Sequence, residues 1–301
     1  MQKSTKLRGV KGASARCALA AMVFLLAKYL LTALISWLMG VRVQGASLGD
    51  PIGYSATAVQ LFQLVIGAGS LALPLLWVLQ TMHLPPLELR LTIPGAWSPG
   101  FCITLFLGLA SVGNLLGSLF VSAGTSIQLP SGGIALVLSF LQLCVLPAIA
   151  EELFFRGALQ GLMRPSGSIA AIVAPALLFA VLHFDLAQSI TALLCGLFLG
   201  WLAERTGSIL PGMLLHFLNN TLAFLQIYLR LYAPVDLAVG FQLFVLLFFP
   251  VFAAIFLWQA RRSGFRFSAG LRPGVSALSA LTSPAYVIGV VFLVLFGIWQ
   301  G

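Results

Sequence analysis

About nine apolar segments make up most of this chain. They run over residues 17–39, 56–80, 101–122, 134–163, 168–185, 186–203, 207–231, 238–260 and 284–300. Each is long enough, or nearly so, for a helix to cross a bilayer core of about 30 Å. Because backbone N–H and C=O groups in lipid must be satisfied within the segment itself, we expect all of them to be helices. Two small-residue motifs, Gly113-x-x-x-Gly117 and Gly196-x-x-x-Gly200, can allow close helix contact.

The composition favours the same fold class. Of the 301 residues, 60% are hydrophobic and 8% are charged, whereas a soluble domain usually has about 25% charged residues. We therefore predict an all-α protein, a polytopic transmembrane bundle of about eight or nine helices. It forms one membrane domain with four expected parts. They are a basic cytoplasmic N-terminal tail (1–16), N-terminal transmembrane helices (17–132), core helices with polar residues inside them (133–232) and C-terminal transmembrane helices (233–301).

Basic residues cluster at two places beside apolar segments. Five of the sixteen lysines and arginines lie within the first sixteen residues, and four lie between Arg261 and Arg272. Such clusters are typical of cytoplasmic flanks that contact anionic lipid. The net charge of +9 therefore indicates a lipid bilayer as partner and no nucleic acid. We expect a cytoplasmic N-terminus and a multi-pass protein of the cell membrane of a bacterium.

Only two of the seven acidic residues lie well inside an apolar segment. They are Glu151 and Glu152, in the stretch "PAIAEELFFRGAL". A charge near the bilayer centre costs roughly 2.5–3.5 kcal/mol on insertion scales. Arg156 lies one helical turn after Glu152 and can neutralise it, whereas Glu151 projects about 100° away. An ion pair that only fixes packing would leave Glu151 unexplained, so we favour one working carboxylate beside a structural pair.

Two of the three histidines lie in apolar helical runs that follow the glutamates. His183 is in "LLFAVLHFD" and His216 is in "GMLLHFLNN". Either alone would be interpreted as a satisfied core histidine, but both lie on the same short part of the chain as the glutamates. Asn220 shares a helix face with His216, and Phe179 lies one turn before His183, where it can wall a site. We predict that residues 151, 183 and 216 line one pocket.

These side chains suit two kinds of hydrolysis. A carboxylate and a neutral imidazole can share a water molecule and take its proton, while a second imidazole and an amide N–H stabilise an oxyanion. Alternatively, Glu151, His183 and His216 form a usual zinc ligand set with one position open for water. The H-E-x-x-H arrangement is absent, so a Zn²⁺ ion would be bound across three helices. The sequence leaves both mechanisms open, with a slight preference for the metal-free one.

The same residues resemble the pattern of the CAAX-protease and bacteriocin-processing (CPBP) family of intramembrane proteases. The family motifs E-E-x-x-x-R, F-x-x-x-H and H-x-x-x-N correspond here to "EELFFR", "FAVLH" and "HFLNN", in the same order. The resemblance covers about residues 140–230. It implies an endopeptidase that hydrolyses a peptide bond in a membrane-associated protein or peptide, in CAAX-type or bacteriocin-type processing. The sequence does not select among these substrates.

The resemblance also implies a role for each motif residue. Glu151 is the expected general base, with His183 beside it. The other four have supporting roles: oxyanion stabilisation by His216 and Asn220, and orientation by Glu152 and Arg156. Two other function classes stay open, namely a catalytically silent membrane interaction or immunity protein on the same scaffold, and a transporter with a charge relay. A transporter would favour inverted repeats, and the sequence shows none.

The helix rise sets a geometric condition on this site. At 1.5 Å per residue, His216 lies about 8 Å from its expected helix start at Pro211. His183 lies about 22 Å from Ser168, and Glu151 lies about 20 Å from Arg164. All three starts are cytoplasmic in the expected topology. The side chains can therefore meet only if the segment 168–185 enters obliquely or begins outside the membrane.

Overall fold

The computed structural model describes residues 2–40, 43–44, 47–48, 54–81, 99–120, 128–268, 271–274 and 277–300. Within these ranges the regular structure is helical apart from one small hairpin, so the predicted fold class is confirmed. In that hairpin, β1 (Val43–Gln44) pairs antiparallel with β2 (Ser47–Leu48).

Six helices in the described part of the chain are long and apolar enough to cross a membrane. They are α1 (Gln2–Met39), α2 (Ala56–Thr81), α3 (Pro99–Gly117) with η1 (Ser118–Phe120), the continuous helix from α4 to η4, α8 (Leu186–Thr206) and α10 (Val235–Arg262). The others are α7 (Ser168–Val181), α9 (Leu210–Tyr232), α11 (Ala277–Leu281) and α12 (Pro284–Gln300). The protein is therefore an integral, multi-pass membrane protein. Because α1 begins at Gln2, the basic N-terminal residues continue the first membrane helix.

The continuous helix changes its hydrogen-bond pattern along its length. Its parts are α4 (Gly133–Phe140), η2 (Leu141–Val145), α5 (Leu146–Glu151), η3 (Glu152–Leu159), α6 (Gln160–Met163) and η4 (Arg164–Ser166). In the π-helical turns η2 and η3, an N–H bonds to the carbonyl five residues earlier, as Leu146 does to Leu141 and Gln160 does to Phe155. Such π-turns occur frequently at functional sites, and η3 begins at Glu152.

The segment expected to cross the membrane over 168–185 ends earlier than predicted. Helix α7 has 14 residues, about 21 Å, which is shorter than a bilayer core of about 30 Å. The chain then reverses over residues 182–185, where Phe184 has a positive φ of 54°. Asp185 caps α8 by accepting a hydrogen bond from the Gln188 N–H at 2.7 Å. His183 therefore lies in the reversal between α7 and α8, not inside a span.

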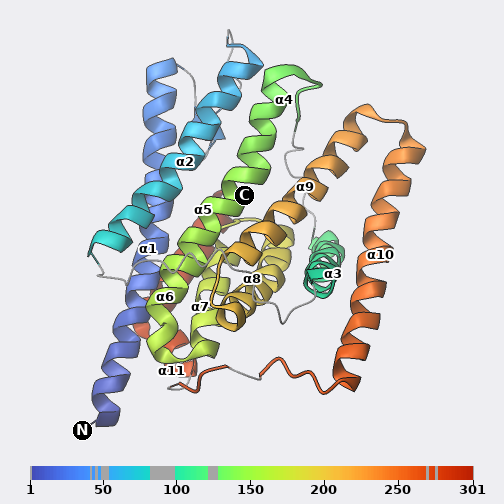
Figure 1. Ribbon diagram of the computed structural model, residues 1–301. Coiled ribbons are helices and arrows are strands. Elements are labelled where there is room, and N and C mark those ends of the chain that lie inside the picture. The colour runs from blue at the N-terminus through green and yellow to red at the C-terminus, as the bar shows by residue number, and fades with distance from the viewer. Residues whose placement is uncertain are drawn as a thin grey trace.

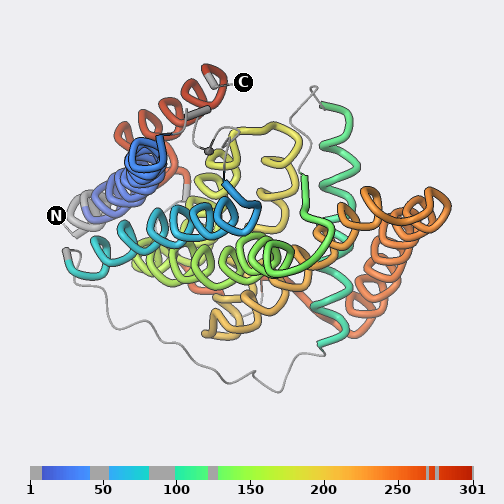
Figure 2. Tube along the Cα trace, turned by 90° about the horizontal axis from the view of Figure 1, so that it is seen from above, coloured from blue at the N-terminus to red at the C-terminus, as the bar shows by residue number. Residues whose placement is uncertain are grey.

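The helices are arranged around the continuous helix, which runs through the middle of Figure 1. Figure 2 shows α1 between α2 and α12, with α10 at the opposite edge of the bundle. In Figure 1, α3 is seen nearly end-on whereas the neighbouring α10 stands upright. The two helices therefore cross at a steep angle.

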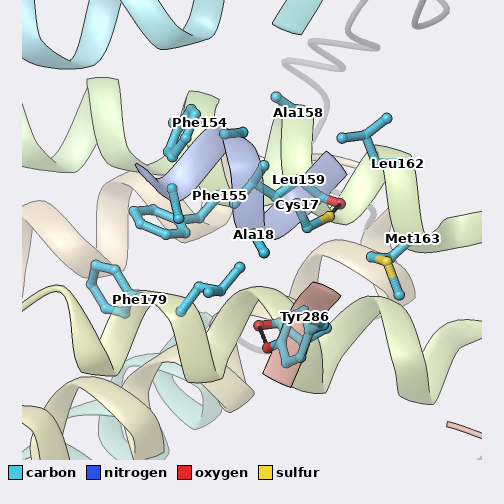
Figure 3. Packing of buried hydrophobic residues seen from close by; sticks show 14 of the residues in the cluster. Cys17, Ala18, Phe154, Phe155, Ala158, Leu159, Leu162, Met163, Phe179 and Tyr286 are labelled. Atoms are coloured by element: carbon cyan, nitrogen blue, oxygen red, sulfur yellow. Dashed lines mark hydrogen bonds between the residues drawn. The ribbon is translucent and has the colours of Figure 1, made fainter. Parts of the chain in front are cut away.

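Small side chains let α1 pack closely against η3 and α6. Figure 3 shows Cys17 and Ala18 of α1 beside Leu159 and the aromatic residues of η3. The Cys17 S–H donates to the Leu159 carbonyl at 3.6 Å. From α12, the Tyr286 hydroxyl donates to the Ala174 carbonyl of α7 at 2.7 Å. These contacts fix both ends of the chain against the helices that carry the sequence motifs.

Glycines allow the close crossings of α3. A Cβ atom on Gly117 would lie 2.5 Å from the Ala187 carbonyl oxygen of α8. A Cβ atom on Gly108 would lie 2.6 Å from the Cβ of Ala253 in α10. Helix α3 can therefore touch both neighbours only because these positions carry no side chain.

We expect Gly117→Ala to lower the free energy of unfolding by about 1–3 kcal/mol, because the new methyl group would push α3 away from α8. Thermal unfolding of the protein purified in detergent measures this. Gly161→Ala is the matched control, since no atom lies within 4 Å of its Cβ position, and alanine favours a helix. A Gly117→Ala variant that melts like the wild type would contradict the packing argument.

Candidate active site

Glu152 is the buried centre of the polar cluster. Its side chain is 0% exposed, and its Oε1 accepts a hydrogen bond from Arg156 Nη1 at 2.9 Å. The same Oε1 lies 3.1 Å from His216 Nδ1. Because a carboxylate can only accept, His216 donates its Nδ1–H to Glu152. The second ring nitrogen, Nε2, is therefore free to act on the other side of the imidazole.

Glu151 lies on that other side. Its side chain is 24% exposed, and its Oε2 is 3.8 Å from His216 Nε2. This distance is longer than a direct hydrogen bond and suits a bridging water or substrate oxygen. The two adjacent glutamates therefore lie on opposite sides of one imidazole. Glu152 is buried, and Glu151 is partly accessible.

His183 joins the cluster through Phe179. Its Nδ1 lies 2.8 Å from the Phe179 carbonyl oxygen, so Nδ1 carries the hydrogen and Nε2 is an acceptor. The Phe179 ring packs edge-on against His183 and His216, with centroid distances of 4.8 and 6.1 Å. The Arg156 guanidinium lies 4.9 Å from the same ring. Phe179 thus walls the site, and His183 is close enough to Glu151 for electrostatic interaction.

Asn220 is less closely connected than the other motif residues. It lies one turn after His216 on α9, half-buried. Its Oδ1 lies 3.4 Å from Asn219 Nδ2. Within the described residues, its side chain forms no direct hydrogen bond to Glu151, Glu152 or the histidines. Its expected part in oxyanion stabilisation therefore stays a prediction.

The expected zinc ligands do not form a metal site in this arrangement. Among the described residues, no three His, Cys, Asp or Glu side chains are grouped so as to hold a metal ion. Glu151 Oε2 and His216 Nε2 are 3.8 Å apart, whereas two ligands about 2.0–2.1 Å from one tetrahedral Zn²⁺ lie roughly 3.3 Å apart. The three side chains as they lie here therefore do not fit a tetrahedral Zn²⁺ ion.

A polar stripe leads from the cluster to the end of α8. Three side chains at four-residue spacing on the continuous helix contact three α8 residues at the same spacing. The pairs are Arg156 with the Gly196 carbonyl (3.3 Å), Gln160 with the Gly200 carbonyl (2.9 Å) and Arg164 with the Glu204 carboxylate (2.9 Å). Because glycine has no side chain, its backbone carbonyl stays accessible to hydrogen-bond donors of the neighbouring helix. The Gly196-x-x-x-Gly200 motif therefore provides hydrogen-bond acceptors as well as close packing.

Glu204 has a structural role that the sequence analysis did not predict. Its side chain is 2% exposed, and besides Arg164 it accepts hydrogen bonds from Ser168 Oγ at 2.7 Å and Arg272 Nη2 at 2.9 Å. It joins α8 to the start of α7 and to the segment after α10. The sequence contains a signal for this contact in its spacing. Glu204 lies eight residues after Gly196, and Arg164 lies eight residues after Arg156, so the two pairs have matching positions on their helices.

Lys28 is a second residue that the sequence analysis did not single out. It lies half-buried in α1 and lines a cavity together with Glu151. The available signal was a lone lysine inside the apolar segment 17–39. An ionisable residue within a membrane span is by default a functional-site hypothesis.

We expect Arg156→Met to lower the free energy of unfolding by about 3–5 kcal/mol, because Glu152 would be left as an uncompensated buried charge. Thermal unfolding in detergent measures the loss. The double variant Glu152→Gln/Arg156→Met carries neither charge and should regain much of the stability. The exposed Arg230 provides the control Arg230→Met. Wild-type stability of the single Arg156 variant would refute a buried charge at Glu152.

Comparison with known families identifies this region. Residues 133–222 match the family model described as type II CAAX prenyl endopeptidase Rce1-like. The matched range contains all six predicted site residues, so the resemblance noted in the sequence is confirmed for this part of the chain. Comparison with curated proteins and with solved structures gives no match.

Proposed function

We propose that the Rce1-like domain of this protein is an active intramembrane endopeptidase, which hydrolyses a peptide bond in a membrane-associated protein or peptide. The family match supports a protease in general. The specific observation behind the proposal is the pairing of an accessible carboxylate, Glu151, with the free Nε2 of His216 across 3.8 Å. The expected plasma-membrane location in a bacterium belongs to the same proposal.

Glu151 is the proposed general base. A water molecule held between its carboxylate and the acceptor Nε2 of His183 would give its proton to Glu151 while its oxygen attacks the peptide carbonyl. The same carboxyl group would then pass that proton to the leaving amine. The hydrogen bond from His183 Nδ1 to the Phe179 carbonyl supports this role, because it fixes the tautomer in which Nε2 accepts.

His216 is the proposed oxyanion stabiliser. With Nδ1–H bonded to Glu152, its protonated form can donate Nε2–H to the negative oxygen of the tetrahedral intermediate. A carboxylate behind an imidazole orients the ring and stabilises the imidazolium. Asn220, one turn further along α9, would be the second donor. Glu152 and Arg156 are positioning residues in this scheme, since they act through His216.

Glu151→Gln should lower kcat by about 10²–10⁴-fold, the usual contribution of a general base, and leave the melting temperature close to that of the wild type. Cleavage of a membrane-tethered peptide in detergent or vesicles measures it. Asp236→Asn, at an exposed acid in α10, is the matched control. Equal cleavage by Glu151→Gln and wild type would exclude this base, and absence of cleavage by the wild type would favour a silent scaffold.

Exhaustive dialysis against a chelator should leave kcat/KM of the wild type unchanged, because Glu151, His183 and His216 do not form a three-ligand set. Metal analysis of the same samples should show less than one ion per active molecule. Loss of activity on dialysis and recovery with Zn²⁺ would show that the ligands rearrange around a metal, contrary to the proposed mechanism.

A further inference from the structure

A cavity adjoins Glu151 on the side of α1 and α2. Its volume is about 260 Å³, and its walls come from α1, α2, η2 and α5. Most of the lining is apolar. The polar exceptions are Lys28, Gln63, Ser70, Gln142 and Glu151. Because Glu151 belongs to both, this cavity and the proposed catalytic cluster are neighbours.

Lys28 provides the positive charge in this cavity. It lies eleven residues before the end of α1 at Met39, about 17 Å along the helix, and therefore at membrane depth. Its ammonium interacts electrostatically with Glu151. Within the described chain, however, no carboxylate lies within ion-pair distance of it and it donates no hydrogen bond. The ammonium thus keeps three donors for a ligand.

Gln142 provides an unsatisfied acceptor in the same cavity. Its Nε2 donates to Gln63 Oε1 at 3.0 Å. Its Oε1 is buried and has no hydrogen-bond partner among the described residues. Buried polar atoms nearly always have a partner, either in the protein or in ordered water, so a water molecule or a ligand donor would complete this site. The residue lies in the π-turn η2, a kind of turn that is common at functional sites.

The polar groups of the cavity complement those of a peptide. A free ammonium is complementary to a carboxylate, and an amide carbonyl oxygen is complementary to a peptide N–H. The apolar remainder, which includes Phe24, Ile66 and Leu146, suits aliphatic side chains. A peptide that reaches from Glu151 into the cavity would bring a carboxylate within reach of Lys28.

We propose that this cavity binds the peptide substrate next to its scissile bond and that Lys28 selects substrates with a carboxylate there. This inference rests on the proposed peptidase function of the neighbouring cluster. Lys28 then determines specificity from a helix outside the matched range 133–222. The carboxylate has two sources in a peptide, the chain end or an Asp or Glu side chain.

The test uses matched peptides, each with a free or an amidated C-terminus and with Glu or Gln beside the scissile bond. Against the wild type, the preferred carboxylate should lower KM by about 10–100-fold relative to its neutral partner, as for a charge-assisted hydrogen bond. Lys28→Met should lose this difference in KM between the charged and the neutral peptide. Lys28→Arg should retain the preference, as should the control Lys11→Met at an exposed position of α1.

Two outcomes overturn the inference. Equal losses of Lys28→Met on charged and neutral peptides would mean that the lysine acts only on Glu151 or on folding. The second uses a cleavage-deficient His183→Ala form, alone and combined with Lys28→Met, with binding of each peptide measured by fluorescence anisotropy. If the form that keeps Lys28 binds the charged and the neutral peptide equally well, the inference is wrong. Because binding needs no turnover, this measurement tests the inference even if the protein does not cleave peptides. The peptidase proposal itself is tested separately by the Glu151→Gln variant.

Discussion

The buried carboxylate of Glu152 is the constraint that brings the motif helices together. Inside a membrane-embedded bundle this charge needs a cation and hydrogen-bond donors, and it finds them in Arg156 of its own helix and His216 of α9. Arg156 in turn reaches the Gly196 carbonyl of α8. Helix α9 can approach because Gly212 has no side chain, since a Cβ there would lie 3.1 Å from Glu152 Oε2. One buried charge thereby fixes the relative positions of three helices.

The two adjacent glutamates differ because the helix surface turns by about 100° per residue. The Glu152 side chain is 0% exposed and holds the imidazole of His216 in place, whereas the Glu151 side chain is 24% exposed and faces the opposite ring nitrogen. The same imidazole therefore connects a structural carboxylate to an accessible one. One carboxylate is therefore accessible, while its neighbour is held by two hydrogen bonds.

Helices outside the matched range complete the surroundings of the cluster. Helix α1 packs on η3 and α6 through Cys17 and Ala18 and places Lys28 beside Glu151. At the other end of the stripe, Glu204 ties α8 to Arg272, beyond α10. The matched range 133–222 supplies the proposed catalytic groups, while α1 and α2 supply walls of the cavity next to them.

The fold class and the candidate residues of the site came from the sequence, because hydropathy, helical spacing and the cost of buried charge are local properties. The apolar segments, the Glu152–Arg156 pair and the family resemblance belong to this kind of information. Other features depend on contacts between distant segments. The approach of α9 places His216 between Glu152 and Glu151, and packing of α1 puts Lys28 into the cavity that Glu151 lines. Only the tertiary structure could decide these, because each depends on where another helix lies, and one-dimensional spacing does not contain that information.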